Sequence, residues 1–163
     1  MSLTPIKRYC LFLIIGLTAV GCNDNNNTSV PSSPVHVSIN TRMEYTSFVP
    51  TNLNSSILID AEGYHYNNNI YPLKYGDYYG FAGVIVHITL EGKYVAYDAG
   101  CPHCLSKQHP VVPDGMFAIC PTCHEEFEIG NGVGNPTRGV TSECLRRYNA
   151  QYNAATGIIS VNN

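Results

Sequence analysis

The sequence has few charged residues, no tryptophan and no segment with the periodicity of a helix. Only 13% of the residues are charged and the formal net charge is -3, so the chain lacks the basic surface that binds nucleic acid. Tyrosine, in contrast, occurs 12 times, and glycine, proline, asparagine and threonine are spread along the chain. This composition is typical of short strands joined by turns. The sequence therefore predicts an all-β protein without a nucleic-acid partner.

The N-terminal segment has the features of an export signal. Lys7 and Arg8 form a short basic region, and the apolar run over residues 9–17 is shorter than the roughly 20 residues that a spanning helix needs. The run leads to Ala-Val-Gly-Cys22, which resembles the lipobox of bacterial lipoproteins. This resemblance implies a signal peptide over residues 1–22 and a lipid on Cys22 that holds the protein in the bacterial cell envelope, on the periplasmic or the surface side. An ordinary secretory signal is the alternative, and it would leave Cys22 as a free thiol.

The rest of the chain reads as a tether followed by one domain. Residues 23–34 are polar, contain two prolines and predict a flexible tether. Residues 35–163 are enough for a single domain. Within it, residues 64–79 are rich in tyrosine and asparagine and predict an irregular loop, and His87 is expected to point outward from its strand. Strands are predicted at 35–40, 55–59, 84–90, 93–98, 111–119 (a hairpin), 127–129, 145–152 and 157–161.

Two short cysteine motifs, which we call the knuckles, stand out in residues 100–130. They are Cys101-Pro102-His103-Cys104 and Cys120-Pro121-Thr122-Cys123-His124. A C-x2-C pair that recurs after a gap of roughly 15–20 residues is typical of a metal site. Disulfide bonds are the competing explanation in an oxidising envelope. Cys144 is left over, either as a small buried residue or as a partner for one knuckle thiol.

The residues around the knuckles resemble those of Rieske [2Fe–2S] domains. The resemblance covers residues 57–161: an A-Y-D-A-G step before C-x-H, a short hairpin, C-P-x-x, a G-N-G…G-N-P…G-V run and two terminal strands. It implies a small antiparallel sandwich or barrel with a metal-binding subdomain made of two hairpin loops. Rieske centres hold one iron with two cysteines and the other with two histidines. Cys101 and Cys120 match the cysteines and His103 the first histidine, whereas Cys123 occupies the position of the second histidine.

Three ligand sets are therefore open. The set that the resemblance implies holds a [2Fe–2S] cluster, with a potential lowered by the extra thiolate, and consists of Cys101, His103, Cys120 and Cys123. A second set holds zinc or a single iron in tetrahedral geometry and consists of Cys101, Cys104, Cys120 and Cys123. A third set keeps His124 as a ligand and leaves Cys104 and Cys123 free to form a disulfide.

Each kind of metal site implies a different function. A [2Fe–2S] centre at hairpin tips implies an electron-transfer module anchored to the envelope, with a redox partner that the sequence does not identify. A four-cysteine zinc site implies a structural metal in a binding or assembly module. The sequence contains no nucleophile–base pattern and has no room for the large second domain of Rieske oxygenases. We therefore expect a carrier or binding module without catalytic activity of its own.

Overall fold

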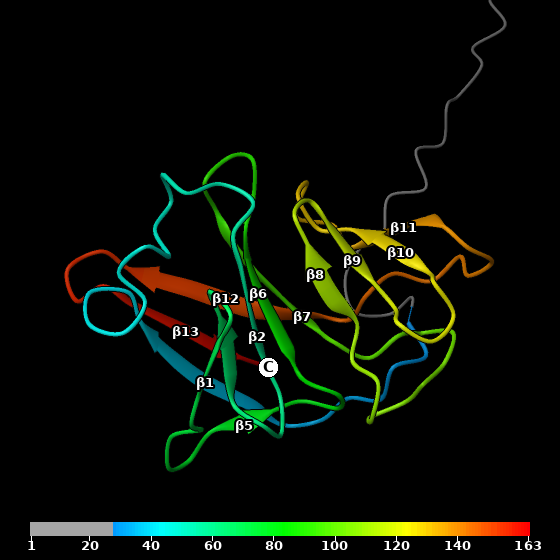
Figure 1. Ribbon diagram of the computed structural model, residues 1–163, viewed down its shortest axis with the longest axis horizontal. Helices are drawn as coiled ribbons and strands as arrows, with labels where there is room; N and C mark the ends of the chain where they lie inside the picture. Colours follow the sequence, from blue (N-terminus) through cyan, green and yellow to red (C-terminus); the bar gives the residue numbers. More distant parts are fainter. Residues whose placement is uncertain (1–27) are drawn as a thin grey trace, which may run out of the picture.

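The computed structural model describes residues 28–163, and these contain thirteen β-strands and no helix, hence none able to cross a membrane. The strands form two antiparallel sheets (Figure 1). In spatial order, the nine-stranded sheet consists of β4 (Asn69–Tyr71), β3 (Tyr64–Tyr66), β2 (Ser56–Ile59), β6 (Val84–Ile88), β7 (Tyr94–Asp98), β12 (Arg147–Asn153), β13 (Ile158–Asn162), β1 (Val35–Asn40) and β5 (Tyr78–Tyr79). The four-stranded sheet consists of β11 (Asn135–Arg138), β10 (Glu126–Glu128), β9 (Phe117–Ile119) and β8 (Val112–Asp114). The predicted all-β class is confirmed.

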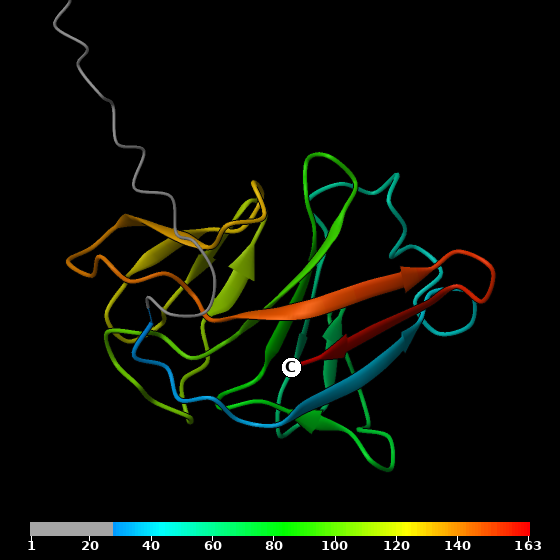
Figure 2. The ribbon, with the colours of Figure 1, turned by 180° about the vertical axis from the view of Figure 1, so that it is seen from behind.

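The nine-stranded sheet curls around its own core. Figure 2 shows β1, β12 and β13 side by side as a layer in front of β2 and β6. Alternate residues of β1, such as Val37 and Ile39, point inward because successive side chains of a strand face opposite ways. They belong to one fully buried cluster with Ile57 of β2 and Val86 of β6, which we call the first core. The apolar alternation in the sequence therefore correctly predicts the inward-facing residues of β1.

A second core lies between the two sheets. Leu58 of β2 and Ile85 of β6 face away from the first core and belong to a cluster with Phe127 and Ile129, which follow the second knuckle in the chain. Strand β6 is consequently buried on both faces, and every one of its residues is buried. The expectation that His87 points outward is wrong, because the four-stranded sheet covers the face on which that side chain lies.

His87 is a buried histidine that has no charged partner in the part of the chain that the structure describes. Its side chain is fully buried, and its Nδ1 lies 2.9 Å from the Ser56 hydroxyl oxygen on the neighbouring strand. Its Nε2 has no hydrogen-bond partner among residues 28–163. Burial disfavours the charged imidazolium and lowers the pKa of His87 to about 4.

This histidine makes the fold sensitive to acid. The unfolded chain binds a proton at His87 below about pH 6.5, whereas the folded chain does so only near pH 4. The contribution of His87 to the free energy of unfolding is therefore fully present above pH 6.5 and is lost as the pH falls from 6.5 to 4. We expect a loss of roughly 3 kcal/mol from this group between pH 7 and pH 4. Urea unfolding at both pH values should show a smaller loss for His87→Gln. His36→Gln is the control: His36 is exposed, so this variant should lose as much stability as the wild type. Equal losses in the wild type and His87→Gln would contradict the expectation.

The predicted loop over residues 64–79 is in fact partly ordered into β3, β4 and β5. Asn67 and Asn68 both adopt positive φ angles, 49° and 60°, which is the geometry of a two-residue hairpin turn. Tyr64 and Tyr66 point into the first core instead of covering the surface. Asparagine tolerates positive φ, so the Asn-Asn pair is a hairpin signal that the composition of the segment obscures.

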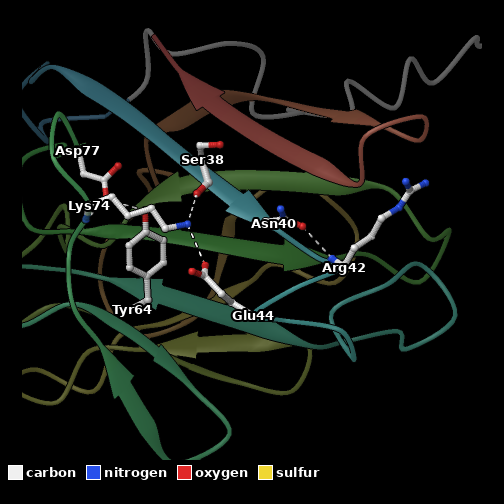
Figure 3. Close-up of polar contacts among 7 residues, drawn as sticks. All are labelled: Ser38, Asn40, Arg42, Glu44, Tyr64, Lys74 and Asp77. Carbon is white, nitrogen blue, oxygen red and sulfur yellow. Dashed lines mark hydrogen bonds and ion pairs between the residues drawn. The ribbon is translucent and has the colours of Figure 1, made fainter.

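Lys74 ties the end of this segment to the opposite side of the sheet (Figure 3). Its ammonium nitrogen donates to the Ser38 carbonyl at 3.0 Å, lies 2.9 Å from the Glu44 carboxylate and sits 5.4 Å from the Tyr64 ring centroid. The Tyr64 hydroxyl donates to Asp77 at 2.7 Å, and burial together with this carboxylate raises the pKa of Tyr64. These contacts hold residues 74–77 against β1.

The signal segment, Cys22 and the first part of the tether lie outside the described residues. Residues 28–34, the end of the predicted tether, pack on the domain. Val30 is fully buried, and its carbonyl accepts a hydrogen bond from the Arg146 Nε at 2.8 Å. The Ser29 hydroxyl donates to Glu143 at 2.7 Å. The chain therefore joins the domain close to the loop that precedes β12.

Candidate metal centre

The two knuckles have the same backbone geometry. In the first, the Leu105 N–H donates to the Cys101 carbonyl at 2.9 Å, and in the second the His124 N–H donates to the Cys120 carbonyl at 3.0 Å. Leu105 and His124 both have positive φ angles, 50° and 61°, which side chains other than glycine adopt rarely. Each knuckle is thus a tight loop that turns its two sulfurs toward the same point. The first follows β7, and the second joins β9 to β10.

The four knuckle sulfurs form one compact group. All four Sγ atoms lie within 4.8 Å of one another. The Cys101–Cys123 pair is 3.7 Å apart and the Cys104–Cys120 pair is 3.9 Å apart. An ion bound tetrahedrally by thiolates at about 2.3 Å places its sulfurs about 3.8 Å from each other. The spacing therefore fits four thiolates on one ion.

The same distances exclude disulfides between the knuckles. All four cysteines are free, and the sulfur–sulfur distances of 3.7 and 3.9 Å far exceed the bond length of about 2.05 Å between disulfide sulfurs. The Cys104–Cys123 disulfide that accompanies the third ligand set is therefore absent from the described residues. Cys144 is buried and disulfide-bonded, and it does not belong to the four-sulfur group.

The sulfurs differ in their surroundings. Cys101 and Cys120 are fully buried in the second core, whereas Cys104 and Cys123 are half-buried. Burial raises the pKa of Cys101, and burial with the neighbouring thiols raises the pKa of Cys104 to about 12. Burial also opposes ionisation of Cys120, but the N–H groups of Cys123 and Thr122 outweigh it and lower the pKa of that thiol. Four such groups ionise together only when a cation neutralises them.

The histidines of the knuckles lie outside the four-sulfur group. His103 is exposed, and its Nδ1 lies 3.8 Å from the Cys104 Sγ. His103 instead lies in a second group, within 4.8 Å of Cys123 and of the Glu125 carboxylate. His124 is exposed and belongs to neither group. Among residues 28–163, the four-sulfur group thus has the composition of the second predicted set, whereas His103 shares a separate group with Cys123 and Glu125.

Asp98 holds the backbone that leads into the first knuckle, a role that the sequence does not predict. Its fully buried carboxylate accepts hydrogen bonds from the Tyr148 hydroxyl at 2.6 Å and from the N–H groups of Phe81 and Gly100, both at 2.7 Å. A fourth, longer bond comes from Ala82 at 3.2 Å. Burial raises the pKa of Asp98, and these hydrogen bonds offset part of the rise. In the sequence, the only hint of this role is that Asp98 is a carboxylate at the end of a strand composed otherwise of apolar residues and tyrosines.

Together these features define an all-β domain with a four-cysteine group that can bind a metal ion. No protein-family model matches the sequence, and no curated protein matches it either. Among solved structures, the chain is similar to the ferredoxin of carbazole 1,9a-dioxygenase from Nocardioides aromaticivorans IC177. The TM-score is 0.37 and the identity 18%, over 49% of this chain and 74% of that chain. At this level the similarity concerns the course of the strands alone.

Proposed function

We propose that the protein is an electron-transfer module in which Cys101, Cys104, Cys120 and Cys123 hold a single iron ion. The observation that carries the proposal is the mutual spacing of the four sulfurs, all within 4.8 Å. Ligands on the two irons of a [2Fe–2S] cluster lie farther apart than this, because a second iron and two sulfides stand between them. The geometry therefore supports the four-cysteine set over the set that the Rieske resemblance implies.

The burial of the sulfurs fits a redox role. Cys101 and Cys120 anchor the site in the second core, while Cys104 and Cys123 reach the surface from opposite knuckles. An iron ion bound there supplies a one-electron couple, and a partner that docks on the outer sulfurs comes close to it. The hydrogen-bonded knuckles keep the sulfurs in place when the iron gains or loses an electron. The structural change that accompanies electron transfer is therefore small. Zinc fits the same four thiolates but has no redox chemistry.

Metal analysis of the protein purified without oxygen tests the proposal. We expect a coloured protein with sulfur-to-iron charge-transfer bands, one iron per chain and no acid-labile sulfide. Two irons with stoichiometric sulfide would instead support the [2Fe–2S] set with His103 as a ligand. Colourless protein that contains only zinc would overturn the electron-transfer function and make the site structural.

Location and partner are further parts of the proposal. Attachment to the envelope through a lipid on Cys22 stays a prediction from the sequence, as does a redox partner protein. A centre near the surface, on a domain joined to a tether, is suited to meeting such a partner at the membrane.

A further inference from the structure

Glu125 is a buried carboxylate next to the proposed metal site. Its side chain is 2% exposed, and a charged group removed from water requires compensating contacts. The carboxylate accepts hydrogen bonds from the Val140 N–H at 2.6 Å and the Thr141 N–H at 3.3 Å. Within residues 28–163 it forms no ion pair. Among the described residues, backbone N–H groups and not a cationic side chain therefore hold the carboxylate in place.

The loop after β11 is shaped to close over this carboxylate. Gly139 has a φ of +121°, and a Cβ atom at this position would overlap both oxygens of Glu125. Only glycine combines this backbone conformation with so close an approach. The following residue, Val140, is mostly exposed, so the loop lies between the carboxylate and the solvent. The close contact thus requires both the buried Glu125 carboxylate and the absence of a side chain at Gly139.

The carboxylate lies close to a sulfur of the site. One Glu125 oxygen, the Cys123 Sγ and a ring nitrogen of His103 are all within 4.8 Å of one another. A negative charge at this distance repels an electron that is added to the thiolate-bound ion. Because the loop keeps water away, this repulsion is screened less than between surface charges. The oxidised form of the centre is therefore favoured.

We propose that Glu125 lowers the reduction potential of the metal centre by placing a negative charge beside Cys123. The inference rests on the proposed function, since it requires a redox-active ion on the four thiolates. Glu125 acts on the potential through its charge beside Cys123 and is not a ligand of the metal. Local charge and hydrogen bonding around the sulfurs are known levers on the potential of iron–sulfur centres.

The test compares midpoint potentials of the full-length protein loaded with iron. Glu125→Gln keeps the size of the side chain and an oxygen for the Val140 N–H but removes the charge. We expect the reduction equilibrium of Glu125→Gln to shift about tenfold toward the reduced form. For one electron, this corresponds to a midpoint potential that is more positive by about 59 mV. Glu125→Asp retains the charge and should stay closer to wild type. Glu126→Gln is the matched control, because the neighbouring Glu126 is paired with Arg138 at 3.4 Å.

The outcomes separate this inference from the proposed function. Iron-loaded Glu125→Gln with the wild-type potential overturns the inference and leaves electron transfer intact. A chain that binds no redox-active iron overturns the proposed function and the inference with it. If Glu125→Gln fails to fold, Gly139→Ala displaces the loop, admits water to the carboxylate and should raise the potential by a smaller amount. An unchanged potential in that variant also contradicts the inference.

Discussion

Cys104→Ala is expected to abolish tight metal binding, whereas the adjacent substitution His103→Ala leaves the metal in place. The Cys104 sulfur is one of the four that meet within 4.8 Å, so its loss leaves three ligands and an open position. The His103 ring is exposed and stands outside that group. Binding of structural zinc to such sites is worth about 10–16 kcal/mol in small peptides, and loss of a ligand removes a large part of it. Metal content and visible spectra of the two variants measure the difference.

The neighbouring positions make this a matched pair, because both variants alter the same exposed loop. A spectrum that survives Cys104→Ala and disappears in His103→Ala would reinstate the cluster ligands implied by the Rieske resemblance. Loss of metal in both variants would show that the loop as a whole, and not one sulfur, determines binding. Cys104→Ser adds a further comparison, since it retains the size of the side chain and replaces the sulfur by oxygen.

Asp98→Ala is expected to destabilise the fold by at least about 4 kcal/mol, since each buried donor left without an acceptor costs about 1–3 kcal/mol. The substitution strips the acceptor from four donors, among them the Gly100 N–H that precedes the first knuckle. We also expect the metal to dissociate faster, because the Gly100 contact orients Cys101. Urea unfolding and transfer of the metal to a chelator measure the two effects.

Tyr148→Phe is the control for this substitution. It removes one donor but leaves the Asp98 carboxylate bonded to three backbone N–H groups, so the loss should be about 1.5–3 kcal/mol. A loss for Asp98→Ala no greater than that for Tyr148→Phe would show that the backbone donors find other partners. It would also show that Asp98 is not needed to hold the first knuckle in place.

The parts of the fold that follow from local patterns could be predicted. Strands such as β1, β6 and β13 have apolar alternation or β-branched runs, and the turns between them contain glycine or asparagine. The pairing of the knuckles at one metal site also follows from spacing, because two C-x2-C pairs separated by about 15 residues are typical of such a site. The structure places the first knuckle between β7 and β8, which belong to different sheets, and the second between the paired strands β9 and β10. What spacing alone leaves open is whether a histidine or the second cysteine of each pair completes the site, since Cys104 directly follows His103 in the chain.

The features that could not be predicted depend on segments distant in the sequence. His87 is buried because the four-stranded sheet covers its face of β6, and the alternation within that strand does not contain this information. Asp98 and Glu125 are buried because of partners about 50 and 15 residues away, and both have the appearance of ordinary surface acids in the sequence. Tyr64 and Tyr66 lie in the core on the first strand of a hairpin that turns at Asn67 and Asn68.

The double burial of β6 limits how the protein can vary and be divided. A strand with one face in water tolerates change at every second residue, but β6 has no such position. A one-residue slip would exchange the residues of the two cores, so both cores fix its register. Removing the four-stranded sheet would expose Leu58 and Ile85 to solvent. The metal-binding half therefore cannot be separated from the rest of the domain, and substitutions should be tolerated better at exposed positions of strands such as β4 and β8 than in β6.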